Sequence, residues 1–451
     1  MGTALIILAA GRGTRMKSDL PKVLHPIAGA PMLAHAMRAG AALEPDHTIV
    51  VTGHGADDVA GAARAQDSGV QIAHQSDQKG TAHAVAQAAP LLDGYEGDVI
   101  VLYGDTPFIS PDTLHRLSRA RGTHDIVVLG FETTDPGRYG RLIMNGDSLE
   151  NIVEFKDADA DARAVTFCNS GIMAARADLL FDLIGEVGSG NAAQEFYLTD
   201  VPGIARARGL TATAIACDQA ETLGINSRAE LAAAEAAFQA RARADALQTG
   251  VALPAPETVH FAHDTVVGRD TVIEQFVVFG PGVTVGPGAR IRAFSHLEGC
   301  HVARGATVGP YARLRPGTEL AEDTRIGNFV EVKNAVIDAG AKVNHLSYIG
   351  DAHLGAHTNI GAGTITCNYD GVMKHHTEIG RNVFVGSNST IIAPARIGDN
   401  AMSAAGSVIV RPVPAEAMGV ARARQENKPG FATKLFDLLR SKKEKRDKGA
   451  G

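Results

Sequence analysis

The stretch IGRNVFVGSNSTIIAPARIG (residues 379–398) carries an aliphatic residue at every sixth position. The same six-residue step runs from Val308 to Ile409, with two steps that are one residue short and one interruption between Ile360 and Ile379. The repeating positions are Val308, Leu314, Leu320, Ile326, Val332, Ile337, Val343, Ile349, Leu354, Ile360, Ile379, Val385, Ile391, Ile397, Ser403 (one polar substitution) and Ile409. A period of six fits neither a helix nor a free strand. It is typical of a solenoid in which each short strand points one aliphatic side chain inward and glycines make the turns.

Composition bounds the remaining possibilities. The 451 residues are too many for one ordinary core, so two or three domains are expected. A net charge of −7 with no basic stripe argues against nucleic acid as a partner. The four cysteines are far apart in the chain, which indicates reduced thiols, and no apolar run approaches the length of a membrane span. We expect a soluble, cytoplasmic protein with no membrane partner.

The first half of the chain alternates short apolar runs with helical stretches. This alternation predicts a doubly wound, mostly parallel α/β sheet that ends near Arg228. The expected strands are residues 4–10, His47–Thr52, Val70–Ala73, Asp98–Tyr103, Asp125–Phe131 and Ala212–Cys217, and the expected helices include Met32–Leu43, Thr81–Leu91 and Pro111–Ala120.

A connecting helix follows this domain. Ser227 and Glu230 form a capping box, and Gly250 offers a C-terminal stop, so we expect a helix with Leu231 and Phe238 on one side. The expected domains are residues 1–228, a linker helix at 229–249, and a repeat domain at 250–451. The repeat is expected to end after Pro412 and Pro414, and the basic run 440–448 is expected to be a solvated, disordered end.

The first candidate site follows the first strand, in LAAGRGTRM (residues 8–16) and LPK (residues 20–22). A glycine-rich turn after a strand lets backbone N–H groups approach phosphates. The third glycine of a dinucleotide fingerprint is replaced by Met16, and the P-loop sequence is absent. The cations Arg15 and Lys22 instead suit a triphosphate attacked at its α-phosphorus. Asp105, at the carboxyl end of a neighbouring strand, is a suitable ligand for Mg²⁺.

A second candidate site lies on the repeat itself. His345 follows the inward Val343 by two residues, and the six-residue step is interrupted between Ile360 and Ile379. That interruption predicts a loop leaving the coil, and a loop beside a histidine and cationic side chains can form a pocket. A lone histidine on a solenoid is more often a surface residue, but here the loop and the cations favour a site.

These motifs resemble a known family. Leu8–Lys22, Gln75 with Gly80-Thr81, Tyr103–Asp105, Asn169–Gly171 and Gly224–Asn226 resemble those of sugar-1-phosphate nucleotidylyltransferases. With the repeats attached, the chain to about Gln425 resembles the bacterial bifunctional N-acetylglucosamine-1-phosphate uridyltransferase/glucosamine-1-phosphate N-acetyltransferase family. The resemblance implies a Rossmann-like nucleotidyltransferase domain, joined by a helix to a left-handed parallel β-helix of hexapeptide repeats. It also implies a homotrimer with the acetyl site between subunits.

The resemblance implies roles for residues of the N-terminal half. Lys22 and Arg15 would neutralise the triphosphate of UTP, and Asp105 and Asn226 would hold Mg²⁺. The other residues of the nucleotide-sugar site would be Leu8, Ala9, Ala10, Gly11, Gln75, Gly80, Thr81, Tyr103, Gly104, Gly140, Glu154 and Asn169.

It implies roles in the repeat domain as well. His345 would be the general base that deprotonates the sugar amine, and Glu331 could orient it. The sugar phosphate and sugar would be bound by Arg315, Lys333, Tyr348 and Asn359. Acetyl-CoA would be bound by Ala362, Asn368, Tyr369, Ser387, Ala405 and Arg422.

The expected function is synthesis of UDP-N-acetylglucosamine, a precursor of peptidoglycan and lipopolysaccharide, from glucosamine 1-phosphate, acetyl-CoA and UTP. Two alternatives keep the same architecture. One is another sugar-1-phosphate nucleotidylyltransferase with a hexapeptide tail, which would not need His345 and its polar neighbours. The other is a non-catalytic regulatory subunit, which should have lost Arg15, Lys22 and Asp105.

Overall fold

The computed structural model describes residues 2–448 and divides the chain into two compact units. The first unit runs to Gln248 and also includes His260–Thr265. The second unit comprises Thr249–Val259 and the chain from Val266 onwards. Each unit is built on its own sheets, as described below.

The first unit is organised on a mixed sheet in the order β11-β7-β10-β6-β1-β4-β5. Its strands are β1 (Thr3–Ala9), β4 (His47–Thr52), β5 (Gln71–His74), β6 (Asp98–Tyr103), β7 (Ile126–Glu132), β10 (Phe167–Arg176) and β11 (Ala212–Cys217), with the hairpin β8 (Arg141–Asn145) and β9 (Ser148–Val153) attached to β10. Within the seven-strand order, neighbouring strands are parallel except at β10, which runs antiparallel to both β6 and β7; the hairpin strands β8 and β9 are also antiparallel. The sequence prediction of a mostly parallel sheet is correct, but it missed β8, β9 and β10.

Helices cover both faces of this sheet. Alternate residues of β1 enter two separate cores: Leu5 and Ile7 pack on one side, and Ile6 and Leu8 on the other. One core is completed by helices α1 (Met32–Ala41), α2 (Ala56–Gln66) and α4 (Pro111–Arg121), and the other by α3 (Thr81–Ala86), α6 (Ala177–Ile184) and α7 (Val201–Ala207). The carboxyl ends of β1 and β6 are thereby held side by side, where parallel strands place ligand sites. The remaining short elements of this unit are β2 (Pro26–Ile27), β3 (Ala30–Pro31), α5 (Ala160–Ala164) and the 3-10 helices η1 (Thr14–Met16), η2 (Lys22–Leu24), η3 (Ala89–Leu91), η4 (Leu198–Asp200) and η5 (Gln219–Thr222).

The helix after the sheet, α8 (Arg228–Gln248), belongs to the first unit. Leu231 and Phe238 pack into a small core of this unit, on one side of the helix as the sequence predicted. The buried amide of Gln239 anchors the helix further: it donates to Phe261 O at 2.7 Å and accepts from Phe261 N at 2.8 Å.

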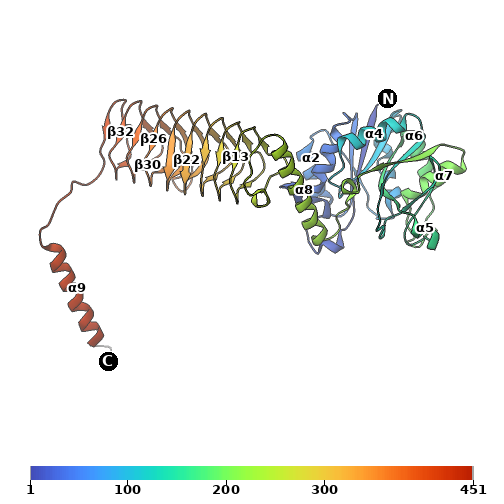
Figure 1. Cartoon of the computed structure of the whole chain (residues 1–451), viewed down its shortest axis with the longest axis horizontal. Helices are drawn as coiled ribbons and strands as arrows, with labels where there is room; N and C mark the ends of the chain where they lie inside the picture. Colours follow the sequence, from blue (N-terminus) through green and yellow to red (C-terminus); the bar gives the residue numbers. More distant parts are fainter. Residues whose placement is uncertain (1, 449–451) are drawn as a thin grey trace. The chain divides into compact units, whose positions relative to one another are not determined.

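The second unit is a parallel β-helix whose coils stack along one axis (Figure 1). A short 3-10 helix, η6 (Pro256–Thr258), precedes the first coil. Its first face contains β12 (Val266–Val267), β15 (Thr284–Val285), β18 (Cys300–Val302), β21 (Thr318–Leu320), β23 (Glu331–Ile337), β25 (Tyr348–Leu354), β28 (Thr377–Ile379) and β31 (Ala395–Ile397). Its second face contains β13 (Val272–Ile273), β16 (Arg290–Ile291), β19 (Thr307–Val308), β22 (Arg325–Asn328), β24 (Lys342–His345), β26 (Asn359–Ile360), β29 (Phe384–Val385), β32 (Met402–Ser403) and β34 (Met418–Gly419). Its third face contains β14 (Val278–Phe279), β17 (His296–Leu297), β20 (Arg313–Leu314), the first halves of β23 and β25, β27 (Ile365–Cys367), β30 (Thr390–Ile392) and β33 (Val408–Ile409).

The six-residue aliphatic step forms the core of this β-helix. Every repeating position from Val308 to Ile409, including Ser403, is at most 3% exposed. The interruption between Ile360 and Ile379 contains a loop, as predicted. Thr366 of β27 is fully buried one six-residue step after Ile360, and the chain leaves the coil only between Cys367 and Thr377. The sequence therefore predicted both the solenoid and the coil that carries an insertion.

Two predictions about the end of the chain are wrong. The coil continues past Pro414, because Met418 and Gly419 of β34 pair with β32. The basic run is also ordered, since it forms the second half of helix α9 (Phe431–Lys448). All of the described side chains of α9 are exposed, so the expectation of a solvated end is correct.

Two candidate active sites

The first site begins in the loop that leaves β1. Gly13 has the left-handed φ of 58°, and a Cβ placed on it would lie 2.6 Å from Lys22 Cβ. A glycine is therefore required for the loop to fold closely against Lys22. Met16 is buried beneath the loop and fixes η1, whereas Arg15 on the same turn is exposed.

Two residues from distant segments meet at Lys22. Its Nζ forms a close ion pair with Asp105 Oδ2 and donates to Asn226 Oδ1 at 3.1 Å. The Lys22 and Asp105 side chains are only 13% and 16% exposed. A backbone hydrogen bond from Ile225 N to Asp105 O (3.1 Å) holds the two acceptor segments together. The structure thus brings together Lys22 and both of the expected metal ligands.

A cavity of about 310 Å³ opens beside this cluster. Its lining contains Leu8, Ala9, Ala10, Gly11, Lys22, Val23, Gln75, Gln78, Gly80, Thr81, Ala84, Tyr103, Asp105 and Glu195. Most of the residues expected to bind the nucleotide are therefore in one place, whereas Arg15 and Asn226 do not line this cavity. Val23, Gln78, Ala84 and Glu195 line the cavity as well and were not predicted from the sequence.

Hydrogen bonds shape the rim of the cavity. The buried amide of Gln75 donates to Gly80 O at 3.2 Å and contacts His83 Nδ1 at 2.9 Å. Gln78 Nε2 donates to Ala10 O at 2.6 Å, which ties the segment before α3 to the loop after β1. Gly80 has a φ of 115°, and a Cβ there would lie 2.4 Å from Phe196 O, so a larger residue would push the rim apart.

The residues expected to surround the sugar lie around Tyr103. A Cβ on Gly171 would lie 2.7 Å from the Tyr103 ring, so a larger residue at this position would clash with the ring. Burial, reinforced by the charges of Asp105 and Glu154, raises the pKa of Tyr103 and keeps its hydroxyl protonated. Burial also raises the pKa of Glu154. The hydrogen bond that Thr199 Oγ1 donates to its Oε1 at 3.2 Å offsets this increase only in part.

The neighbouring predicted residues are held by the backbone. Asn169 is nearly buried, and its N–H donates to Gly140 O at 2.9 Å. A Cβ on Gly140 would lie 3.5 Å from Glu154 Oε1, so these three residues are close neighbours. Gly104 N donates to Leu8 O at 3.0 Å and joins the ends of β6 and β1.

The oxygens of Asp105 and Asn226 fit a magnesium ion. Both contact one ammonium group, so they converge on a single point that already attracts a cation. Hard oxygen ligands are those that Mg²⁺ prefers, and this ion is commonly held by one or two protein oxygens together with substrate phosphates. No cluster of three or more His, Cys, Asp or Glu side chains suited to a metal occurs within residues 2–448.

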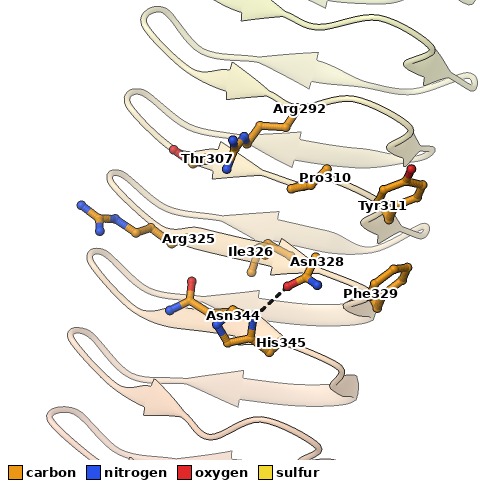
Figure 2. Close-up of a pocket in the computed structure, with 12 residues that line it drawn as sticks. Arg292, Thr307, Pro310, Tyr311, Arg325, Ile326, Asn328, Phe329, Asn344 and His345 are labelled. Atoms are coloured by element: carbon orange, nitrogen blue, oxygen red, sulfur yellow. Dashed lines mark hydrogen bonds between the residues drawn. The ribbon is translucent and has the colours of Figure 1, made fainter.

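The second site lies at the corner between the second and third faces of the β-helix. A cavity of about 550 Å³ there is lined by Arg292, Thr307, Gly309, Pro310, Tyr311, Arg325, Ile326, Gly327, Asn328, Phe329, Asn344 and His345. His345 Nδ1 lies 2.7 Å from Asn328 Oδ1 on the preceding coil (Figure 2). The His345 side chain therefore lines a pocket, and its ring contacts Asn328, which was not predicted from the sequence as a site residue.

The residues expected to bind the sugar phosphate form a second group on the third face. Arg315 Nη1 donates to Glu331 Oε1 at 2.8 Å, and Glu331 pairs in register with Tyr348. Lys333 pairs with Gly350, and a Cβ on that glycine would lie 2.4 Å from the Tyr348 hydroxyl. Glu331 was expected to help orient His345; in this chain its carboxylate forms an ion pair with Arg315.

The loop that leaves the coil starts beside these third-face residues. Asn368 is 8% exposed, and its Nδ2 donates to Asp351 Oδ2, whose other oxygen accepts from Asn334 Nδ2 at 2.6 Å. Burial alone would raise the pKa of Asp351, but these two amides and the charges of Lys333 and Lys374 lower it below its usual value. The repulsion from Lys333 lowers the pKa of Lys374 in turn, so two ammonium groups lie close together at the base of the loop.

The remaining expected acetyl-CoA positions follow one another up the coils. Asn388 N donates to Ala362 O at 2.7 Å, and Gly406 N donates to Ser387 O at 2.8 Å. Ala405 and Arg422 come next: a Cβ on Gly406 would lie 4.0 Å from Arg422 Cδ. Tyr369 is 59% exposed on the loop, and Asn359 lies in β26 on the second face. The predicted set thus occupies two faces, a corner and the inserted loop of the β-helix.

Two family models match the chain. The first is the MobA-like NTP transferase domain, over residues 5–171. The second is the bacterial transferase hexapeptide (six repeats), over residues 264–299 and 376–411.

Curated relatives match over the full length. The chain is 67% identical over 448 residues to "Bifunctional protein GlmU" of Ruegeria pomeroyi, which covers 99% of this chain and 100% of the relative. The protein of the same name from another Ruegeria species is 64% identical, and the match covers 100% of both chains. That from Cereibacter sphaeroides is 63% identical, and the match covers 99% of this chain and 98% of the relative. The chain belongs to the GlmU family. The resemblance drawn from the sequence is confirmed, and so are the fold class, with its left-handed β-helix, and the assignment as a bifunctional transferase of UDP-N-acetylglucosamine synthesis. GlmU membership also sets aside the two alternatives, a monofunctional nucleotidylyltransferase and a non-catalytic subunit.

Proposed function

We propose that the β-helix unit acetylates glucosamine 1-phosphate with acetyl-CoA, and that the N-terminal unit then couples the product to UTP. The uridylyltransferase is assigned to residues 1–228, the connecting helix to 229–249, and the acetyltransferase to 250–451. The product would supply peptidoglycan and lipopolysaccharide precursors. The observation that carries the first activity is the meeting of Lys22, Asp105 and Asn226 beside the cavity at the end of β1.

In the N-terminal site, Lys22 neutralises charge on the triphosphate while a phosphate oxygen of the sugar attacks the α-phosphorus and pyrophosphate leaves. The sugar phosphate is itself an anionic nucleophile, so catalysis consists mostly of positioning and charge neutralisation. Arg15 is exposed on the same loop as Lys22, and we assign it to the outer phosphates. Tyr103, Gly140, Glu154 and Asn169 hold the sugar, with the protonated Tyr103 hydroxyl as a donor.

Asp105 and Asn226 are the proposed ligands of Mg²⁺. When bound, the ion would supply positive charge to neutralise phosphate oxygens. Asp105 and Asn226 would hold it through the two oxygens that contact Lys22 Nζ, and Lys22 would bind the triphosphate.

In the β-helix unit, His345 is the proposed general base. It takes a proton from the amine of glucosamine 1-phosphate as the nitrogen attacks the thioester carbonyl, and the C–S bond to coenzyme A breaks. Arg315, Lys333 and Tyr348, which are neighbours on the third face, bind the sugar phosphate, with Asn359 on the sugar. Ala362, Asn368, Tyr369, Ser387, Ala405 and Arg422 bind acetyl-CoA.

A homotrimer would complete this second site, because the predicted residues are spread over two faces of one chain. An exposed aromatic ladder at the corner supports such a contact surface. Phe276, Phe294, Tyr311 and Phe329 stack with ring centroids 5.0, 4.9 and 5.3 Å apart, and each is 45–56% exposed. Contiguous exposed apolar side chains of this kind can mark a protein–protein contact surface. Light scattering should then give three times the chain mass of 47.0 kDa, and a mass of one chain would contradict the trimer.

A cytoplasmic location is also proposed. Cys168, Cys217, Cys300 and Cys367 are all free thiols, which suits a reducing compartment. A search of residues 2–448 finds no helix long and apolar enough to cross a membrane.

One experiment tests the proposed function as a whole. The purified chain is supplied with glucosamine 1-phosphate, acetyl-CoA, UTP and Mg²⁺, each is omitted in turn, and products are identified by mass spectrometry. We expect UDP-N-acetylglucosamine only from the complete mixture, and N-acetylglucosamine 1-phosphate when UTP is omitted. Formation of a UDP-sugar from glucosamine 1-phosphate without acetyl-CoA would contradict the proposed order of steps.

A further inference from the structure

The backbone of His345 is fixed by its neighbours, but these contacts leave its ring free to rotate. Its carbonyl oxygen accepts from Ser347 Oγ at 2.8 Å and from Gly363 N at 3.3 Å. A general base needs more than a fixed backbone, because only one ring nitrogen can face the amine. The second requirement is therefore a contact that holds the ring itself.

That contact comes from Asn328 on the preceding coil. Its Oδ1 lies 2.7 Å from His345 Nδ1, and both side chains line the same cavity (Figure 2). An amide oxygen only accepts hydrogen bonds, so Nδ1 must carry the ring proton. In the neutral ring the lone pair is then on Nε2, which has no hydrogen-bond partner among residues 2–448. In this tautomer Nε2 is the nitrogen that can remove a proton.

The sheet register, and not a flexible loop, builds this contact. Asn328 and His345 are Cα partners at the ends of β22 and β24. Each is followed by a residue with a left-handed φ, Phe329 (56°) and Leu346 (51°), which turns the chain at the same corner. Leu346 N also donates to Asn328 O at 3.0 Å, so the two corners are tied together.

We propose that Asn328 is a positioning residue for acetyl transfer, which accepts a hydrogen bond from the Nδ1–H of His345 and so orients Nε2 as the base. The proposal rests on the proposed role of His345. In the reaction, Nε2 takes one proton from the amine as the N–C bond forms. The C–S bond breaks with its electron pair on the coenzyme A sulfur, and the imidazolium returns that proton to the sulfur. Throughout, Asn328 holds the other ring nitrogen. The Glu331 carboxylate accepts from Arg315 Nη1 at 2.8 Å, whereas the contact to the His345 ring comes from Asn328.

The test compares Asn328→Ala, Asn328→Asp and His345→Ala in full-length enzyme. Asn328→Ala should lower kcat for acetyl transfer about 10- to 100-fold, the range found for side chains that orient a functional histidine, with little change in KM for acetyl-CoA. Asn328→Asp keeps the acceptor and adds a negative charge. It should therefore recover most of the lost rate and move the acid limb of the pH–rate profile to higher pH. Asn382→Ala is the matched control, because its amide also bonds a side chain one coil away (Asn400 Oδ1, 3.2 Å) and should leave the rate unchanged.

The outcomes separate this proposal from the proposed function. A rate within threefold of wild type for Asn328→Ala, or equal loss in the Ala and Asp variants with no movement of the acid limb, overturns the positioning role. If Asn328→Ala does not fold, the Asn328→Asp profile decides alone. Full acetyl transfer by His345→Ala would instead overturn the proposed function of this site.

Discussion

The Lys22→Ala substitution should disable uridylyl transfer and leave acetyl transfer intact. Lys22 contacts both Asp105 and Asn226, and the ion pair is largely buried, with side chains 13% and 16% exposed. A unit charge about 4 Å from a phosphate oxygen contributes about 4 kcal/mol at an effective dielectric constant near 20. Residual solvent and the other cations of the site reduce the loss to about 2–3 kcal/mol, which is about a 30- to 150-fold fall in kcat/KM.

The same substitution leaves Asp105 without this cation. The protein should lose about 1–3 kcal/mol of stability when one partner of this pair is removed, less than for a fully buried pair because both groups retain some exposure. The variant should therefore remain folded. Its activity is measured as pyrophosphate release from UTP and N-acetylglucosamine 1-phosphate, with acetyl transfer measured on the same preparation.

Arg208→Ala is the matched control in the same unit. Arg208 also pairs with a carboxylate (Asp182, 2.5 Å), but it lies on the surface and outside the cavity. This control should keep both activities. The reasoning would be refuted if Lys22→Ala retained uridylyl transfer within about threefold of wild type, or lost both activities together.

Three further predictions concern metal, backbone and pH. Removal of divalent cations with EDTA should abolish pyrophosphate release but spare acetyl transfer, because Asp105 and Asn226 are the proposed ligands; loss of both activities would contradict separate sites. Gly13→Ala should lower uridylyl transfer at least tenfold and cost about 1–2 kcal/mol by denaturant unfolding, since a Cβ there would lie 2.6 Å from Lys22 Cβ at a left-handed φ; a neutral result would show that the loop can rearrange. Burial opposes charge on His353, but its contacts with Glu378 (2.8 Å) and Asp338 (3.1 Å) raise its pKa overall. Its stabilisation is thus fully present below the unfolded pKa of about 6.5 and lost as pH rises through the raised folded value. His353→Gln should lower the melting temperature more at pH 6 than at pH 9, and an equal effect at both would refute the ion-pair account.

The repeat could be predicted from the sequence because the physical signal is local. Each aliphatic residue that returns at the six-residue step must be buried, and the structure buries every one of them. The strand β10 could not be found in the same way. It contains Gly171, and its pairing with β7 shifts register between Asn169 and Met173, so its polarity alternates irregularly. Helix α9 is not predicted because the basic run 440–448 has the composition of a solvated end, although Phe431, Leu435 and Leu439 precede this run at helical spacing.

The residues of the candidate sites could be predicted only where they belong to a recognisable sequence motif. Lys22, Asp105 and Asn226 belong to three recognisable motifs, and the structure brings them together. Asn328 belongs to no motif. Its place beside His345 depends on the offset of 17 positions between paired residues of β22 and β24, which the sequence does not reveal without knowing how the coil turns. Gln78 was missed for a similar reason, since its contact with Ala10 O joins two segments far apart in the chain.

The most direct test of the central claim, that one chain carries two independent active sites, is a paired assay of His345→Ala. Acetyl transfer to glucosamine 1-phosphate and uridylyl transfer to N-acetylglucosamine 1-phosphate are measured on the same preparation. The account predicts that acetyl transfer falls by about 10²- to 10⁴-fold, the contribution of a positioned base, while uridylyl transfer is unchanged. Retention of acetyl transfer, or equal loss of both activities, would contradict it.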